Sequence, residues 1–166
     1  MTDSKTNPKN QNKLPPFLEQ ALGFNVYRTA QLFRRELIDA LKEYRLTPEQ
    51  WQILAALWTT SDELTQQEIS NLTLKEKQTV SRIIQRLERD GWITKTISKD
   101  DARAFIVRLT PKAKRLNKVI PEKLSAHFKP INPLSVDEEK DLITLLKKLR
   151  FALERPMEEA SDSNPL

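Results

Sequence analysis

Apolar residues recur every three or four positions between Leu22 and Tyr44, which is the spacing of one face of an α-helix. With the Pro15-Pro16 pair before it, this pattern predicts a long helix over about 16–44. The stripe is widened by further apolar residues at Phe17, Leu18, Phe24, Leu32 and Ile38. One intramolecular neighbour does not cover so wide a stripe, and this indicates a second contact surface such as a partner subunit.

Three capping-box patterns, each with a Thr followed three residues later by Gln or Glu, predict successive helix starts. The pairs are Thr47 with Gln50, Thr65 with Glu68, and Thr73 with Glu76. They predict a helix of about three turns, then a short helix, then a helix over about 75–90 that ends at Gly91.

β-Branched and aromatic residues dominate the next two segments, 92–97 and 103–109, which predict a β-hairpin with a charged tip at 98–102. Thr110-Pro111 is expected to start another helix, which Pro121 kinks or interrupts. Ser135 caps a last helix with an apolar stripe of Leu142, Leu145, Leu146, Leu149 and Leu153. The predicted fold is mainly α with a small β-hairpin wing.

The charge of the chain is uneven. The net charge is +5, yet 73–118 holds thirteen Lys and Arg against five Asp and Glu, a net +8 that leaves −3 for the rest. Such a concentration is typical of a surface that contacts phosphates, although an ordinary solvated basic face has the same composition.

Composition also excludes several function classes. The chain has no cysteine, one histidine (His127) and two glycines. Disulfides, cysteine metal sites, most histidine-dependent catalysis and a glycine-rich phosphate loop are therefore not expected, and we predict neither an enzyme nor a metal or cofactor site.

The two ends of the chain are predicted to be flexible tails. The segment 1–15 has no apolar core of a signal peptide, and 156–166 is acidic and polar. No apolar run approaches the ~18 residues of a membrane span. We expect a cytoplasmic protein with a single domain over about 16–155 and no membrane association.

The order of a short helix, a turn, a longer helix and a hairpin is that of a winged helix-turn-helix, in which the longer helix enters the DNA major groove. The candidate DNA-contacting residues of this helix are Lys75, Lys77, Gln78, Thr79, Ser81, Arg82, Gln85 and Arg86. Arg side chains match guanine and Gln side chains match adenine. A solvated helix face is the alternative that the helix alone leaves open.

The hairpin tip offers the candidate wing residues Lys99, Asp101 and Arg103. Asp101 can orient Arg103 through an ion pair, which suits insertion of Arg103 into a narrow minor groove. A generic charged turn is the alternative.

Four segments in order resemble the MarR family of bacterial regulators. They are LTPEQWQILAAL (46–57), TQQEIS (65–70), TVSRIIQRLERDGWI (79–93) and DARAFIVRLTPKA (101–113). The resemblance places Gln78, Thr79, Ser81, Arg82 and Arg86 on the recognition helix and makes Arg103 the wing arginine. Two departures are Ala102, where an arginine is frequent, and Ala113, where glycine is usual.

The resemblance further implies a homodimer formed by the first and last helices, about 16–44 and 110–155, around a winged lobe of about 46–110. Candidate interface residues are Leu22, Val26, Leu142, Leu145, Leu149 and Leu153. It also implies release from DNA by a small aromatic or anionic effector, for which candidate neighbours are Tyr27, Tyr44, Trp51, Trp58 and His127. For each of these residues, ordinary core packing or surface exposure is the favoured alternative. No effector-binding residue is therefore assigned.

Together these features predict a sequence-specific repressor that binds double-stranded DNA at an inverted repeat. The alternative is a winged-helix module for protein contacts or single-stranded nucleic acid.

Overall fold

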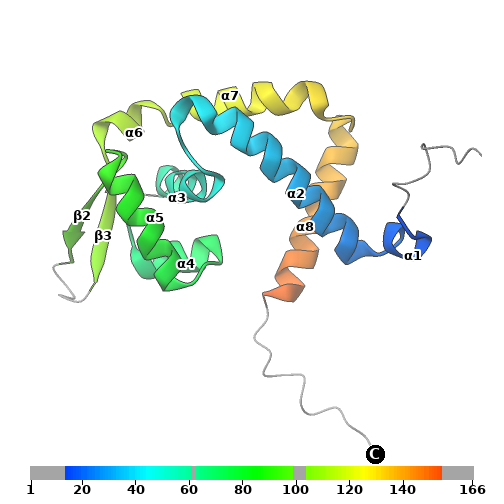
Figure 1. Ribbon diagram of the computed structural model, residues 1–166, viewed down its shortest axis with the longest axis horizontal. Coiled ribbons are helices and arrows are strands. Elements are labelled where there is room, and N and C mark those ends of the chain that lie inside the picture. The colour runs from blue at the N-terminus through cyan, green and yellow to red at the C-terminus, as the bar shows by residue number, and fades with distance from the viewer. Residues whose placement is uncertain (1–13, 61–62, 99–103, 155–166) are drawn as a thin grey trace, which may run out of the picture. The chain divides into compact units, whose positions relative to one another are not determined.

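The computed structural model describes residues 14–60, 63–98 and 104–154 (Figure 1). The chain divides after Phe128 into two units, and each is described by itself. The first unit contains α1 (Pro16–Glu19), α2 (Leu22–Leu41), η2 (Lys42–Tyr44), α3 (Pro48–Thr59), β1 (Glu63–Thr65), α4 (Gln66–Thr73), α5 (Lys77–Arg89), β2 (Ile93–Ile97), β3 (Phe105–Leu109), α6 (Pro111–Arg115) and α7 (Val119–Phe128). The second contains η3 (Lys129–Ile131) and α8 (Val136–Leu153). The predicted class, mainly helical with a small β wing, is confirmed.

The prediction of one continuous helix over 16–44 is wrong. A break at Gln20 and Ala21 separates α1 from α2, and the amide of Asn25 donates to the carbonyl oxygens of Glu19 and Ala21 at 2.8 and 3.0 Å. The far end tightens into the 3-10 helix η2, after which Arg45 adopts a left-handed conformation with φ 53°. The periodicity marked the apolar face correctly but carries no information on such breaks.

Two of the three Thr capping boxes are confirmed, at Thr47 with Gln50 and at Thr65 with Glu68. The third is wrong. Thr73 is still part of α4, where its hydroxyl donates to the Ile69 carbonyl at 2.7 Å. Leu74 then takes a left-handed conformation (φ 53°), and α5 begins only at Lys77.

The helix that starts after the hairpin is interrupted before Pro121, where the sequence predicted the interruption. Helix α6 ends at Arg115, and Pro121 lies in the first turn of α7, where its missing N–H costs no helical hydrogen bond. Thr110 accepts from the Ala113 N–H, as an N-cap should. In the second unit, Ser135 caps α8 as predicted, and Glu138 completes a capping box with it.

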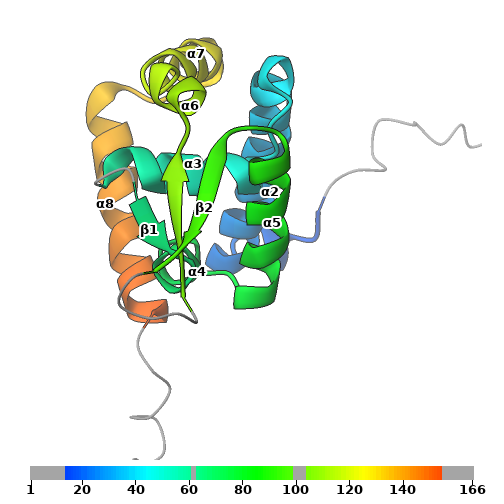
Figure 2. The ribbon, with the colours of Figure 1, turned by 90° about the vertical axis from the view of Figure 1, so that its left-hand side faces the viewer.

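In the first unit, a three-stranded antiparallel sheet with the order β1-β3-β2 packs beside α3, α4 and α5 (Figure 2). The hairpin pairs Ile93 with Leu109 and Ile97 with Phe105. Strand β1 was not predicted from the sequence; it pairs Leu64 with Val107 on the other side of β3. The wing sheet is thereby attached to the chain just ahead of α4.

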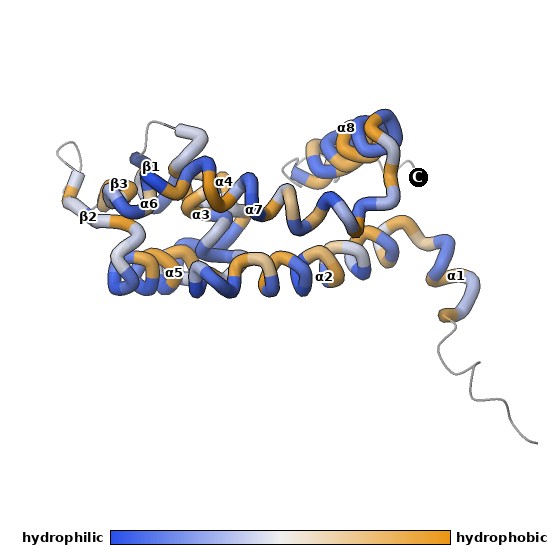
Figure 3. Tube along the Cα trace, turned by 90° about the horizontal axis from the view of Figure 1, so that it is seen from above, coloured by the Kyte–Doolittle hydropathy of each residue, from blue (hydrophilic) through white to orange (hydrophobic). Residues whose placement is uncertain are grey.

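The core lies where α3, α4, α5, the sheet, α6 and α7 meet. Its fully buried members include Ile53, Leu54, Leu57, Ile69, Val80, Leu87, Ile93, Val107, Ala113 and Ile120. By contrast, α2 buries only Leu41, and Leu22 and Phe33 are 65% and 58% exposed. Figure 3 shows apolar residues recurring along α2 and, within its own unit, along α8. Within the described ranges, no helix is long and apolar enough to cross a bilayer.

Candidate nucleic-acid interface

Helix α5 is strongly two-sided. Val80, Ile83, Ile84 and Leu87 are buried in the core, at the spacing of one helix face. Arg86 and Arg89 lie in the last turn, and Gly91 supplies the left-handed residue (φ 71°) that ends the helix. The apolar face therefore fixes which side chains of α5 point outward.

The outward face carries most of the predicted DNA-contacting residues. Exposed residues are Lys77, Gln78, Thr79, Arg82, Gln85 and Arg86, and Ser81 is half-buried. Lys75 is an exception, because it precedes α5 and its backbone carbonyl accepts a hydrogen bond from the Ser70 hydroxyl. Its predicted place on the helix is thus corrected to the turn before it.

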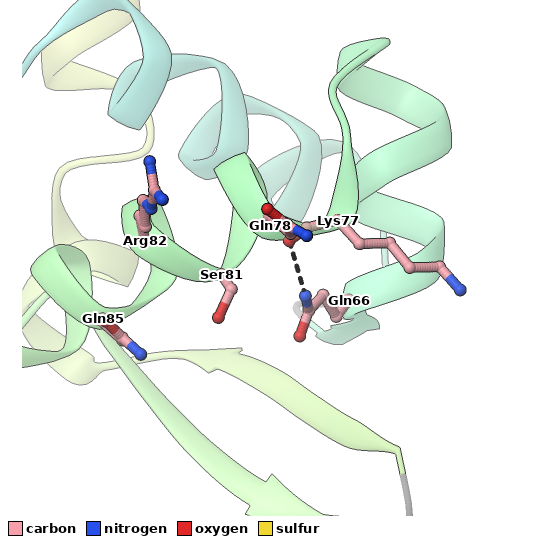
Figure 4. Close-up of a pocket in the computed structure, with 6 residues that line it drawn as sticks. All are labelled: Gln66, Lys77, Gln78, Ser81, Arg82 and Gln85. Carbon is pink, nitrogen blue, oxygen red and sulfur yellow. Dashed lines mark hydrogen bonds between the residues drawn. The ribbon is translucent and has the colours of Figure 1, made fainter.

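Five of these residues line an open depression on the surface together with one residue that was not predicted from the sequence (Figure 4). The lining residues are Gln66, Lys77, Gln78, Ser81, Arg82 and Gln85. The residue that was not predicted, Gln66, is the first residue of α4, and its amide Nε2 donates to the Lys77 carbonyl oxygen at 2.9 Å. Gln66 lies next to α5 because α4 and α5 pack together, and a sequence pattern does not reveal this contact. The one local signal was the predicted N-cap at Thr65, which places Gln66 at the exposed start of a helix.

The cations of this face are available for a ligand. Among the residues that the structure describes, neither Arg82 nor Arg86 has an ion-pair partner. Arg89, near the end of the helix, instead pairs with Asp90 at 2.8 Å, and the hydrogen bond from Arg89 lowers the pKa of the Asp90 carboxyl. The unpaired positive charge therefore lies on the same side as the depression.

The base of the hairpin is fixed to the rest of the lobe. Arg108 on the central strand donates to Glu63 on β1 at 2.6 Å and to Thr96 on β2 at 2.7 Å. Lys95 pairs with Glu88 of α5 at 3.6 Å. The predicted wing residues Lys99, Asp101 and Arg103 lie outside the described residues.

Four of the residues named as candidate neighbours of an effector make contacts within the chain. Trp51 and Trp58 pack together at 5.4 Å, whereas His127 pairs with Glu36 at 3.3 Å. Tyr27 is exposed and accepts a hydrogen bond from Gln31. Within the described part of the chain, no group of three or more His, Asp or Glu residues could hold a metal ion.

Comparison with known proteins agrees with this architecture. The model of the MarR family matches residues 46–104. The HTH-type transcriptional regulator MgrA of Staphylococcus aureus is 30% identical over 144 residues, which are 85% of this chain and 95% of MgrA. The uncharacterized HTH-type transcriptional regulator YkoM of Bacillus subtilis is 32% identical over 129 residues, 75% of this chain and 83% of YkoM.

Two solved structures show the same fold. Overoxidized AbfR bound to DNA is 25% identical with a TM-score of 0.68, and the match covers 83% of this chain and 96% of AbfR. A probable transcriptional regulator from Pseudomonas aeruginosa is 26% identical with a TM-score of 0.68, over 80% of this chain and 98% of that one. The chain therefore belongs to the MarR family of transcriptional regulators and is not an enzyme.

Proposed function

We propose that this regulator binds double-stranded DNA sequence-specifically and places α5 in the major groove. The observation that carries the proposal is the outward face of α5, where Gln78, Arg82 and Gln85 line one depression. A side chain held by a rigid, well-packed helix can meet a base edge at a defined position. The similar AbfR structure, which is bound to DNA, supports DNA binding by this chain.

The residue roles follow from hydrogen-bond chemistry. Arg82 can donate twice to the O6 and N7 acceptors of guanine, and Gln78 or Gln85 can pair with adenine. Lys77, in the first turn, suits a phosphate, because the positive end of the helix dipole favours an anion there. In the same proposal, Lys75, Thr79, Ser81 and Arg86 contact the sugar-phosphate backbone, and Lys99, Asp101 and Arg103 form the wing contact.

The protein acts as a homodimer on an inverted repeat and represses transcription. The exposed apolar residues of α2, and those of α8, support a dimer, since each helix carries an apolar face that its own unit does not cover. Two recognition helices related by a two-fold axis would lie about one DNA turn apart, ~34 Å. Release by a small aromatic or anionic effector stays a prediction.

The test is a selection of binding sites from a randomised duplex library with the full chain, followed by titration of the selected duplex. Arg82→Ala should weaken binding by about 1 to 3 kcal/mol per site and relax the preference at one base pair. Arg35→Ala removes the same charge from an exposed position of α2 and serves as the control.

Two results would contradict the proposal. One is an Arg82→Ala variant with the affinity and base preference of the control. The other is single-stranded DNA that competes as well as the selected duplex, which would favour a single-strand module.

A further inference from the structure

Gln66 is the residue of the depression with no role in the function proposed so far. It is half-buried at the start of α4, next to the N-cap Thr65, whereas the other lining residues belong to α5. Its amide nitrogen donates to the Lys77 carbonyl oxygen at 2.9 Å and so joins the first turns of the two helices (Figure 4).

This hydrogen bond fixes how the Gln66 amide is presented. A carbonyl oxygen only accepts, so the atom that faces Lys77 must be the nitrogen Nε2, and the two ends of the amide cannot be exchanged. One N–H of Nε2 is used by Lys77. Among the residues that the structure describes, nothing else bonds this amide, so the second N–H and the oxygen Oε1 remain for a ligand.

A neighbouring donor and acceptor on one rigid amide match the major-groove edge of adenine, which offers the N7 acceptor beside the N6 amino donor. A phosphate would use only the N–H and would leave Oε1 facing an anion. Guanine presents two acceptors at this edge and would also oppose Oε1. The geometry therefore favours adenine over both.

We propose that Gln66 is a specificity-determining residue that recognises an adenine in the major groove while Lys77 holds its amide in register. The inference rests on the proposed placement of α5 in that groove, because Gln66 shares its depression with Gln78, Ser81 and Gln85. Base recognition thus extends from the recognition helix to the first residue of α4.

The experiment uses the full chain and the duplex selected by the wild type. Each adenine of one half-site is replaced in turn by 7-deaza-adenine, which lacks the N7 acceptor, and the Kd is measured for the wild type, Gln66→Ala and Gln67→Ala. Gln67 is a matched control, since it is an exposed glutamine one position along that bonds Asn71 on its own helix at 2.9 Å.

We expect 7-deaza substitution at the adenine that Gln66 reads to weaken the wild type about 5- to 30-fold, the lower part of the range of one good base contact, because only one of its two hydrogen bonds is lost. Adenines read by Gln78 or Gln85 should keep the wild-type sensitivity in Gln66→Ala. Gln66→Ala should show no further loss at that adenine, and Gln67→Ala should behave as the wild type. Gln66→Met, which keeps the length of the side chain, should repeat the result if Gln66→Ala is unstable in thermal unfolding.

Two outcomes would overturn the inference. If Gln66→Ala keeps the wild-type sensitivity at every adenine, the residue contacts no N7. If Gln66→Ala weakens all duplexes equally, it binds a phosphate or merely positions α5. A failure of the proposed function looks different, because the wild type itself would then select no duplex sequence and Arg82→Ala would change nothing.

Discussion

Trp58 of α3 donates its indole N–H to the carbonyl oxygen of Ala113 in α6, at 3.1 Å and across 55 positions of sequence. Ala113 is fully buried, and the Trp58 ring packs against Trp51 with 5.4 Å between ring centroids. The bond joins the helix that precedes the recognition motif to the segment that follows the wing.

Replacement of Trp58 by Phe should therefore destabilise the protein beyond the effect of a smaller ring. The Ala113 carbonyl loses one of its two donors and keeps the Leu116 N–H at 3.1 Å, and the loss of one hydrogen bond typically costs about 1 kcal/mol. Urea unfolding measures the difference. Trp51→Phe is the control, because the Trp51 indole has no hydrogen-bond partner among the described residues. Equal losses for the two variants would show that the Trp58 bond contributes nothing.

Lys77 and Arg82 should differ in what their removal does to DNA binding. We expect Lys77→Ala to weaken all duplexes to a similar extent, because a phosphate contact carries no base information. Each lost contact should reduce the slope of log K against log salt by about 0.9, hence by about 1.8 for a dimer with two copies of Lys77. Titrations at several salt concentrations measure the slope.

Lys123→Ala, on the exposed face of α7, removes the same charge away from the proposed interface and should leave the slope unchanged. A Lys77→Ala variant with the wild-type slope would remove Lys77 from the phosphate contacts.

Features encoded by residues close in sequence could be predicted. The capping pairs at Thr47, Thr65 and Ser135 depend on contacts three residues apart, and all three are present. The outward face of α5 followed from the spacing of its apolar residues. Local patterns also misled, since Thr73 has the spacing of a capping box but bonds back into α4.

Features that depend on distant residues were missed. Strand β1 has three residues, too few for an alternating pattern, and exists because Leu64 meets Val107 on β3. Gln66 enters the candidate site only through its bond to Lys77, 11 positions away on another helix. Such contacts become visible only when the packing of the helices is known.

The capping box of α4 should make stability depend on acid pH. The backbone N–H and the hydroxyl of Thr65 donate to Glu68, at 2.7 and 2.8 Å, and these bonds lower the pKa of Glu68 below its ordinary value. Because the folded-state pKa is the lower one, the carboxylate stabilises the fold above the unfolded-state pKa of about 4.3. That contribution is lost as the pH falls through the folded-state pKa.

Glu68→Gln keeps an acceptor oxygen for Thr65 but cannot titrate, so its stability should fall less than that of the wild type below about pH 4.3. Urea unfolding at several pH values measures this. Glu122→Gln removes one carboxylate from an exposed position of α7 and should retain the wild-type profile. Parallel profiles for the wild type and Glu68→Gln would contradict the linkage.

The proposed dimer requires that the apolar stripe of α8 lie in the interface between two subunits. This stripe contains Leu142, Leu145, Leu149 and Leu153, and no residue of the helix is buried. Leu145 is 63% exposed, so Leu145→Lys should leave the fold of a single chain intact. In a dimer, the same substitution would place a charge in an apolar interface, where an unpaired charge is strongly unfavourable.

We therefore expect Leu145→Lys to shift the protein from dimer to monomer in analytical ultracentrifugation and to weaken its binding to a full inverted repeat far more than to a half-site. Thr144→Lys is the matched control, because Thr144 lies on the opposite face of α8 and its hydroxyl bonds the Lys140 carbonyl of the same helix, at 2.9 Å. This control should remain dimeric with the wild-type preference for the full repeat. A Leu145→Lys variant that sediments as the wild type does, and binds the repeat as tightly, would show that this stripe does not form the interface, and the covering partner of α2 would then have to be sought elsewhere.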